Sequence, residues 1–366
     1  MESNINTTQE QKSGKLLEVK DLRVSFFTPA GEVKAVGGIS YDLNYDEVMG
    51  IVGESGSGKS VEAYSIIGLL QSPGKVIGGS ITFEGQDVLA KTKEEMTDFR
   101  GREVAMIFQN PMTCLNPVYT VGNQLIEALR AHDKSISKED ASKRAMEMLE
   151  LVGINNVAKR MKQYPHEFSG GMRQRAMIAM TLLCNPKLLI ADEPTTALDV
   201  TIQAQILELM KDLQKKTHMG IIFITHNLGV VAEICDKVSV MYAGKIVEQG
   251  PVDDIFYRPS HPYTVGLLRS MPRVDAESYE RLIPIEGTPV DMLNPPEGCP
   301  FAPRCEHCMK ICLKQMPPYV EIGEDHRSAC WLRVQERKKG EKLGAEGGAL
   351  DKTAPDTKAE EGTDHE

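Results

Sequence analysis

The sequence predicts an α/β fold built around a parallel sheet, with a second, smaller domain after it. One observation is a set of short, strongly apolar segments, typical of strands covered on both faces of a sheet, at residues 47–53, 104–108, 187–192 and 220–226. A second is the helical spacing of apolar residues at 137–154, which begins with a capping pair formed by Ser137 and Asp140. A third is the proline-rich and then cysteine-rich sequence after Gly250. Strands separated by helices imply crossover connections, and the change in amino-acid composition after Gly250 implies the second domain.

The composition is that of an ordinary soluble globular protein, with 41% hydrophobic and 26% charged residues in a chain of 366. No apolar run reaches about 18 residues, the length that spans a bilayer, and the polar N-terminus lacks the apolar core of a secretory signal. We therefore expect a cytosolic protein whose thiols are mostly reduced. The net charge of −10 argues against broad binding to nucleic acid, so no nucleic-acid partner is expected.

Four regions follow one another along the chain. The first residues are polar and expected to be disordered, and strands with alternating apolar residues begin at Leu16. The last residues contain too few apolar side chains to build a core. The expected boundaries are 1–15 for the disordered N-terminus, 16–260 for the main domain, 261–335 for the loop-rich domain with cysteines, and 336–366 for a disordered charged tail.

A phosphate-binding loop is indicated by the stretch GESGSGKS, which lies between a predicted strand and a predicted helix. Its glycines allow consecutive backbone N–H groups to turn inward around an anion. Lys59 would reach the β and γ phosphates, and the Ser60 hydroxyl would ligate Mg²⁺. A chance glycine-rich turn is the alternative. The residues expected to bind nucleotide here are Gly53, Ser55, Gly56, Gly58, Lys59 and Ser60.

An acidic pair ends the apolar segment LLIADEP. Asp192 is placed to hold Mg²⁺ through water, and Glu193 is placed to orient or deprotonate an attacking water. A solvated acidic turn is the alternative, which the upstream phosphate loop disfavours.

The stretch FSGGMRQRAMIAM resembles the signature motif of ATP-binding cassette (ABC) ATPases. The resemblance implies that Ser169, Gly170 and Gly171 open a helix whose free N–H groups suit a γ-phosphate. Further family positions match in order along the chain: Gln109 of the loop that touches Mg²⁺ and faces membrane subunits, Asp199 of the loop that communicates across a dimer, and the switch histidine His226. Taken alone, His226 would be read as a buried core histidine. Phe26 is the candidate for stacking on adenine, with Phe27 as its alternative and a plain core role for either.

The stretches GESGSGKS, FSGGMRQR and ADEPTTALDVTIQAQI are similar to the D-type ATPase subunit of oligopeptide and dipeptide permeases. The resemblance implies an ABC-type nucleotide-binding domain: a phosphate-loop core with a parallel sheet, an antiparallel β subdomain, and a helical subdomain inserted at about 110–170. Asp46 departs from the family pattern, which commonly has glycine there, and Asn227 stands where aspartate is usual.

The resemblance also implies a function. The chain would hydrolyse ATP, sandwiched between its own phosphate loop and the signature motif of an F-type partner ATPase, to energise a membrane importer of dipeptides or oligopeptides. Its partners would be that F-type subunit, two transmembrane permease subunits and, indirectly, an extracytoplasmic substrate-binding protein, so it would lie at the cytoplasmic face of the membrane. The alternatives are an ATPase of the same subfamily that serves nickel or another small solute, and a soluble ABC protein that acts on DNA or ribosomes.

The cysteine-rich stretch GCPFAPRCEHCMKIC, followed by Cys330, predicts a metal site. Zinc is one reading, because Cys305 and Cys308 have zinc-like spacing and because His307 and His326 lie near them in sequence. A second reading is an iron–sulfur cluster, which needs four thiolates, and a third is a set of thiols without metal. Similarity to the C-terminal extension of peptide permease ATPases implies a [4Fe–4S] cluster, with Cys308 as an extra thiol and Arg304 holding the loop around the cluster. The ligands that it implies are Cys299, Cys305, Cys312 and Cys330.

Overall fold

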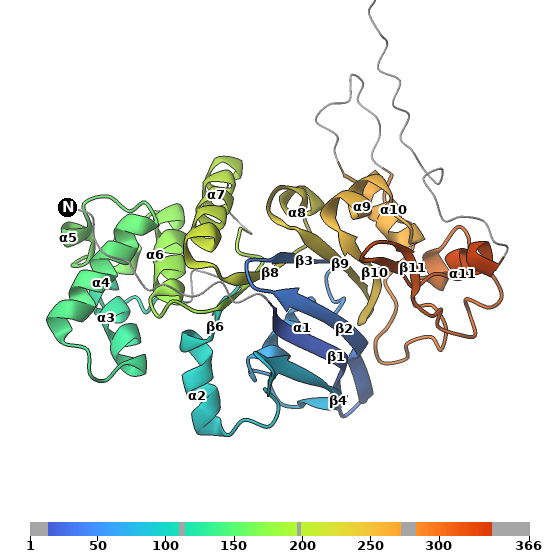
Figure 1. Ribbon diagram of the computed structural model, residues 1–366, viewed down its shortest axis with the longest axis horizontal. Helices are drawn as coiled ribbons and strands as arrows, with labels where there is room; N and C mark the ends of the chain where they lie inside the picture. Colours follow the sequence, from blue (N-terminus) through green and yellow to red (C-terminus); the bar gives the residue numbers. More distant parts are fainter. Residues whose placement is uncertain (1–13, 110–113, 196–198, 272–282, 339–366) are drawn as a thin grey trace, which may run out of the picture.

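The computed structural model describes residues 14–109, 114–195, 199–271 and 283–338 (Figure 1). Two sheets and the helices that flank them make up this part of the chain. The expected disorder of the two tails concerns mainly residues 1–13 and 339–366, which lie outside the described residues. No helix within the described ranges is long and apolar enough to cross a membrane.

The smaller sheet is antiparallel and contains four strands in the order β2-β1-β4-β5. Alternate side chains of β1 are buried, among them Leu17, Val19, Leu22 and Val24, which matches the alternating apolar pattern of the sequence. This sheet is the expected antiparallel β subdomain. Its strands are β1 (Lys15–Thr28), β2 (Gly31–Asn44), β4 (Gly74–Phe83) and β5 (Gln86–Asp87).

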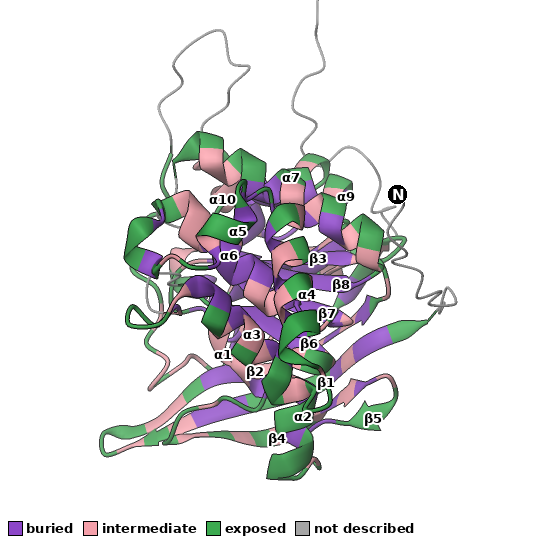
Figure 2. Cartoon of the chain, turned by 90° about the vertical axis from the view of Figure 1, so that its left-hand side faces the viewer, coloured by how far each residue is buried: buried purple, intermediate pink, exposed green. Residues whose placement is uncertain are grey.

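The larger sheet contains eight strands in the order β11-β12-β10-β9-β3-β8-β7-β6. Five of them are mutually parallel, and every residue of the central strands β3, β7 and β8 is buried, as expected for strands covered on both faces (Figure 2). The parallel strands are β3 (Val48–Val52), β6 (Val104–Ile107), β7 (Leu188–Asp192), β8 (Gly220–Thr225) and β9 (Lys237–Tyr242). The antiparallel strands are β10 (Lys245–Pro251), β11 (Val320–Gly323) and β12 (His326–Ser328).

A group of helices between β6 and β7 forms the expected helical insertion, seen beyond β6 in Figure 1. Its second member begins after Ser137, whose hydroxyl oxygen accepts a hydrogen bond from the Asp140 backbone N–H at 3.0 Å, so the cap predicted from the sequence is confirmed. The group consists of α3 (Val121–His132), α4 (Lys138–Leu151), α5 (Val157–Arg160), the short η2 (Pro165–Glu167) and α6 (Gly170–Leu182).

The remaining helices flank the two sheets (Figure 1). They are α1 (Lys59–Ile66), α2 (Lys93–Arg102), α7 (Val200–Thr217), α8 (Leu228–Ile234), α9 (Val252–Tyr257), α10 (Pro262–Arg269), the short η3 (Ala302–Arg304) and α11 (Trp331–Lys338).

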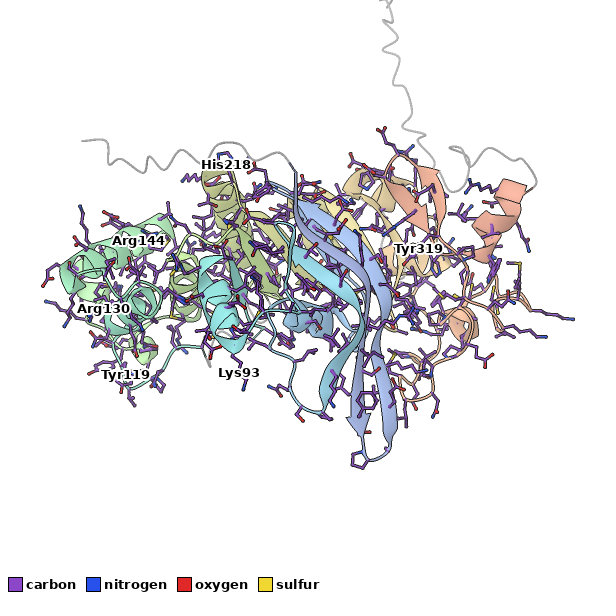
Figure 3. All side chains as sticks on the ribbon, turned by 60° about the horizontal axis from the view of Figure 1, so that its bottom comes forward. Lys93, Tyr119, Arg130, Arg144, His218 and Tyr319 are labelled. Atoms are coloured by element: carbon purple, nitrogen blue, oxygen red, sulfur yellow. The ribbon has the colours of Figure 1, made fainter. Side chains whose placement is uncertain are left out.

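The C-terminal region continues the larger sheet, because the hairpin of β11 and β12 pairs with β10. At this junction the fully buried Glu248 accepts hydrogen bonds from the backbone N–H groups of Ser260 and His261 at 2.7 and 2.8 Å, and bonds the His326 ring at 2.8 Å. Tyr319, labelled in Figure 3, donates its hydroxyl to the Ile246 carbonyl at 2.7 Å. The sequence did not predict this shared sheet, and the boundary expected at 260 stays a prediction.

Two departures from the family pattern have local structural reasons. Asp46 has a φ of +60°, the left-handed region that favours glycine, and its carboxylate pairs with the His218 ring at 2.9 Å. His218 is labelled in Figure 3. The Asn227 side chain accepts a hydrogen bond from the Gly229 backbone N–H at 3.0 Å and caps α8, as an aspartate would.

Candidate functional site

The phosphate loop joins β3 to α1 and packs tightly against neighbouring backbone. A Cβ atom added to Gly53 would lie 2.1 Å from the Met241 carbonyl oxygen, and one added to Gly58 would lie 2.4 Å from that of Ala35. Both glycines also have positive φ values, so only glycine fits at these positions. Gly56, also at positive φ, has nothing within 4 Å of an added Cβ. The loop therefore packs against backbone at Gly53 and Gly58, and it is open at Gly56, next to the exposed Ser55.

Lys59 lies at the centre of this loop. Its ammonium group donates to the carbonyl oxygens of Gly53 and Glu54 at 2.8 and 2.9 Å, and its side chain is buried. Burial lowers the pKa of Lys59, while the carboxylates of Glu193, Asp192 and Glu54 act in the opposite direction. The arrangement keeps a cation beside the backbone N–H groups that would surround a phosphate.

Asp192 ends β7 and is 1% exposed. Burial raises the pKa of its carboxyl group; the neighbouring Glu193 charge adds to this effect, and the Ser60 hydroxyl and Lys59 oppose it. Neither carboxylate oxygen has a hydrogen bond of normal geometry within the described residues. A buried carboxylate without a hydrogen-bond partner favours a bound cation. The Ser60 hydroxyl and the Asp192 carboxylate therefore fit the Mg²⁺ ion that the phosphate-loop motif implies.

The three predicted catalytic residues lie together at the ends of three neighbouring strands. Gln109, after β6, donates its side-chain amide to one carboxylate oxygen of Glu193 at 3.0 Å. The ring of His226, after β8, lies 3.1 Å from the other oxygen. Glu193 itself follows β7 with a φ of +47°, and its backbone N–H donates to the Ile224 carbonyl at 2.9 Å. The Glu193 side chain is 15% exposed and that of His226 is 62% exposed, so the pair lies at the mouth of the site.

The signature residues lie on a different surface of the chain. Ser169 caps α6 by accepting a hydrogen bond from the Met172 backbone N–H at 3.3 Å, and an added Cβ on Gly170 would meet nothing within 4 Å. Gly171 faces the Ile202 side chain. In Figure 1, α6 and α1 are separated by β6, so the structure does not bring the signature residues to the phosphate loop of the same chain.

Two further predicted residues lie apart from the phosphate loop. Asp199 caps α7 and accepts a hydrogen bond from the Ile202 backbone N–H at 2.9 Å. Phe26 is half-buried in β1, where an added Cβ on Gly74 would touch its ring. Phe27 is about half exposed. The roles of Asp199 at a dimer interface and of Phe26 in adenine stacking stay predictions.

The four cysteines proposed as cluster ligands line one pocket. Its walls include Cys299, Cys305, Cys312 and Cys330, together with His307, Phe301 and Trp331. Burial raises the pKa of Cys299 to about 12 and that of Cys305 to about 11. Cys308 is exposed and is not among the residues that line the pocket. Among the described residues, no three His, Cys, Asp or Glu side chains are grouped so that they could hold a metal ion.

Two residues of this region have partners that lie far away in the sequence. His326, considered as a zinc ligand, is buried at the sheet junction and bonds Glu248 instead. The guanidinium of Arg304 reaches Glu54 of the phosphate loop at 2.7 Å, and its role in holding the cysteine loop around a cluster stays a prediction. In both cases the true partner is far away in sequence, and no local pattern indicates it.

Glu62 is a buried residue of the site that sequence reasoning missed. It lies on α1 behind the phosphate loop and receives a hydrogen bond from the Tyr41 hydroxyl. Burial raises the pKa of Glu62 well above its ordinary value, and the charge of Asp192 adds to the effect. A glutamate in the first turn of a helix usually indicates a solvated side chain, so the sequence carried no signal of its burial.

Comparisons with known proteins agree with this geometry. A family model described as ABC transporter matches residues 36–196, and one described as the C-terminal region of oligopeptide/dipeptide transporters matches residues 247–312. The chain is 58% identical to the oligopeptide transport ATP-binding protein of Bacillus subtilis, over 87% of this chain and 89% of that protein. It is 55% identical to the dipeptide transport ATP-binding protein of the same organism, over 88% of this chain and 96% of the relative.

Solved structures are similar as well. A dimeric bacterial ABC transporter cassette matches with a TM-score of 0.58 and 24% identity, over 64% of this chain and 98% of that one. A cassette of the cbiONQ transporter complex of Clostridium perfringens matches with a TM-score of 0.58 and 27% identity, over 69% of this chain and 95% of that one. The predicted α/β cassette fold is therefore confirmed.

Replacing Glu193 by glutamine should separate binding from hydrolysis. Glu193→Gln keeps the shape and the contact with Gln109, but it cannot accept a proton from water. We expect a loss of about 10²- to 10⁴-fold in the ATP turnover of the assembled transporter, with nucleotide affinity nearly unchanged. Glu150→Gln on the exposed face of α4 is the matched control and should have no effect. Normal turnover in Glu193→Gln would show that another group is the base.

Glu62 predicts an unusual dependence of stability on pH. A carboxyl group whose pKa is raised by folding contributes stability that is present below its unfolded pKa and is lost as the pH rises through the folded pKa. Glu62→Gln keeps the acceptor for Tyr41 and removes the titration. In urea unfolding we expect this variant to be more stable than the wild type at pH 8, by about 1–3 kcal/mol, with the difference shrinking toward pH 5.

The exposed Glu324 provides the control, since Glu324→Gln should leave stability unchanged at both values of pH. A Glu62→Gln variant that is less stable than the wild type at pH 8 would mean that the Glu62 carboxylate is charged and compensated in the folded state.

Proposed function

Because this chain belongs to the ABC transporter ATPases of the oligopeptide/dipeptide type, we propose that it hydrolyses ATP to drive the import of dipeptides or oligopeptides through a membrane. The observation that carries the proposal is identity of more than half of the aligned residues to peptide-transport ATP-binding proteins over nearly the whole chain. The match extends past the cassette into the C-terminal region, which has a family model of its own.

The residues of the site divide the work of ATP hydrolysis. Lys59 and the backbone N–H groups of the phosphate loop would bind the phosphates, and Ser60 and Asp192 would hold Mg²⁺. The bound Mg²⁺ would neutralise phosphate charge. Glu193 would accept the proton of the attacking water, and its contacts with Gln109 and His226 would hold its carboxylate in place.

A partner ATPase would complete the site. Ser169, Gly170 and Gly171 present the N-terminus of the 13-residue helix α6 at the surface, away from the chain's own phosphate loop. Free N–H groups at a helix N-terminus suit a phosphate. We propose that they close the ATP site of an F-type partner, while the partner's signature closes the site at Lys59. Asp199, at the adjoining end of α7, would lie at the same interface.

Two membrane subunits would dock beside Gln109. Large apolar side chains are exposed in the residues that follow Gln109 in the sequence, among them Val118 at 71% and Tyr119 at 53%. Tyr119 is labelled in Figure 3. Apolar groups exposed together mark an interaction surface. We therefore propose a peripheral location at the cytoplasmic face of the membrane, with an extracytoplasmic binding protein delivering the peptide to the membrane subunits.

Peptide uptake tests the proposed substrate. A strain that lacks the gene, and that requires an amino acid, should fail to grow when a short peptide is the only source of that amino acid. The wild-type gene should restore growth and the Glu193→Gln gene should not. Unchanged growth on peptides, together with a lost uptake of nickel or another small solute, would assign the chain to that solute instead.

We further propose that Cys299, Cys305, Cys312 and Cys330 bind a [4Fe–4S] cluster, with zinc as the alternative. The proposal is supported by their positions around one pocket. A single ion at about 2.3 Å from each sulfur needs thiolates close together, whereas a cluster of four irons spaces its thiolates more widely. The cluster would supply the positive charge that keeps these thiols, whose pKa burial raises, in their thiolate form.

Metal analysis decides between the two. Protein purified without oxygen should contain about four irons and four acid-labile sulfides per chain and absorb broadly in the visible range. Cys312→Ser should lose the iron, and Cys308→Ser, outside the pocket lining, should retain it. Stoichiometric zinc without iron, or no metal at all, would contradict the cluster.

A further inference from the structure

Arg304 connects the cysteine pocket directly to the phosphate loop. It is the last residue of η3 and precedes Cys305, one of the cysteines that line the pocket. Its two terminal nitrogens donate to the two carboxylate oxygens of Glu54, at 2.7 and 3.1 Å. Glu54 is the second residue of the phosphate loop, 250 positions earlier in the chain. Paired bonds between guanidinium and carboxylate are the strongest side-chain contacts available and also fix direction.

The guanidinium group has little freedom to move. Its Nε donates to the Glu286 carbonyl at 2.9 Å, and the terminal nitrogens also reach the Ile285 carbonyl at 3.1 Å and the Tyr242 hydroxyl at 3.2 Å. The side chain is 5% exposed, whereas that of Glu54 is 26% exposed. The hydrogen bonds with Glu54 raise the pKa of Arg304, so the group is charged at any physiological pH. A pair this well shielded is weakened little by salt.

A second route joins the same two sites. The fully buried Tyr263 accepts a hydrogen bond from the Glu54 backbone N–H at 2.9 Å. Its ring packs against Phe301, with 5.3 Å between the ring centroids, and Phe301 lines the cysteine pocket. Glu54 is thus held by the C-terminal region at both its backbone and its side chain.

The remaining bonds of Glu54 lead into the ATP site. Its carbonyl oxygen accepts hydrogen bonds from Lys59 at 2.9 Å and from the Ser57 backbone N–H at 3.2 Å. A displacement of Glu54 would therefore change the position of the lysine and of the backbone N–H groups that meet the phosphates. Such small displacements have large effects where a site depends on preorganised donors.

We propose that Arg304 is a positioning residue of the ATP site, which fixes the phosphate loop through Glu54 and couples the cysteine pocket to nucleotide binding. The inference rests on the ATP site proposed above, but not on the identity of the metal that the cysteines bind. Because coupling between two sites is reciprocal, a nucleotide that orders the loop must also act on the pocket.

Nucleotide affinity of the full-length protein tests the first half of the proposal. We would titrate it with a fluorescent ATP analogue and compare Arg304→Met, Arg304→Lys, Glu54→Gln and the double variant Arg304→Met/Glu54→Gln. Arg304→Met and Glu54→Gln should each weaken nucleotide binding about 5- to 50-fold. Arg304→Lys should lose less, because lysine keeps the positive charge but cannot make the paired bonds of a guanidinium. The double variant should bind no more weakly than the weaker single variant, because both break one contact.

Arg333 provides the matched control. It lies three residues after Cys330 and bonds the Ser260 carbonyl and Glu336, not the phosphate loop. Arg333→Met should bind nucleotide as the wild type does. Glu54→Gln changes no residue of the C-terminal region. It therefore tests the contact between Arg304 and Glu54 even if Arg304→Met does not fold.

The fluorescence of Trp331, the single tryptophan of the chain, tests the second half of the proposal, that nucleotide binding acts on the cysteine pocket. Trp331 lines the cysteine pocket, and its indole N–H donates to the Gln315 carbonyl at 2.9 Å. Adding ATP should shift its emission in the wild type and in Arg333→Met, and this response should disappear in Arg304→Met and Glu54→Gln at saturating nucleotide. A purely structural role of Arg304 would lower stability without removing the response from folded, saturated protein.

Two results would contradict different claims. Wild-type affinity in both Glu54→Gln and Arg304→Met, or a Trp331 response that persists in them, would overturn the coupling while leaving the ATP site intact. If the wild type binds no nucleotide, and Lys59→Ala changes nothing, the proposed ATP site itself is wrong.

Discussion

Five neighbouring parallel strands of the larger sheet determine where the chemistry of this protein is located. The carboxyl ends of parallel strands meet at one edge of a sheet, and the crevice beyond that edge is where such folds bind ligands. The phosphate loop follows β3, Asp192 and Glu193 end β7, and His226 follows β8. Gln109 follows β6 at the edge of the sheet. Residues spread over more than 170 positions of the sequence are therefore close together because the strands that they follow are neighbours in the sheet.

This constraint explains how much the sequence could predict. Parallel strands buried on both faces are short apolar runs, so β3, β6, β7 and β8 were recognisable, and the residues after them were natural candidates for the site. The contacts of Glu193 with Gln109 and His226 follow from that arrangement once the strand order is known. By contrast, a partner that comes from a distant segment without periodicity leaves no signal in the sequence, and for this reason the contact between Arg304 and Glu54 was not predicted.

The buried charged residues near the phosphate loop also differ in whether the sequence predicted them. Lys59, Asp192 and Glu62 are all removed from water within one small region, and only part of the cost of desolvation is offset by their mutual contacts. For Lys59 and Asp192 a bound nucleotide and its cation would provide the missing opposite charges. Glu62 lies behind them and has no such ligand, and its burial accounts for the raised pKa of its carboxyl group. The sequence motifs indicated Lys59 and Asp192 as ligand-binding residues, whereas Glu62 belongs to no motif and its burial is determined by packing alone.

The C-terminal region is part of the cassette and not an attachment to it. Its hairpin pairs with β10, and it supplies the buried His326 that bonds Glu248. Removing the region would expose the edge of β10 and leave the Glu248 carboxylate without this partner, which are two recognised causes of aggregation and instability. A truncated cassette therefore cannot show what the cysteine pocket contributes, because its losses would be losses of folding. Only substitutions at single contacts, such as the one between Arg304 and Glu54, separate the effect of the pocket on the phosphate loop from the effect of the region on the fold.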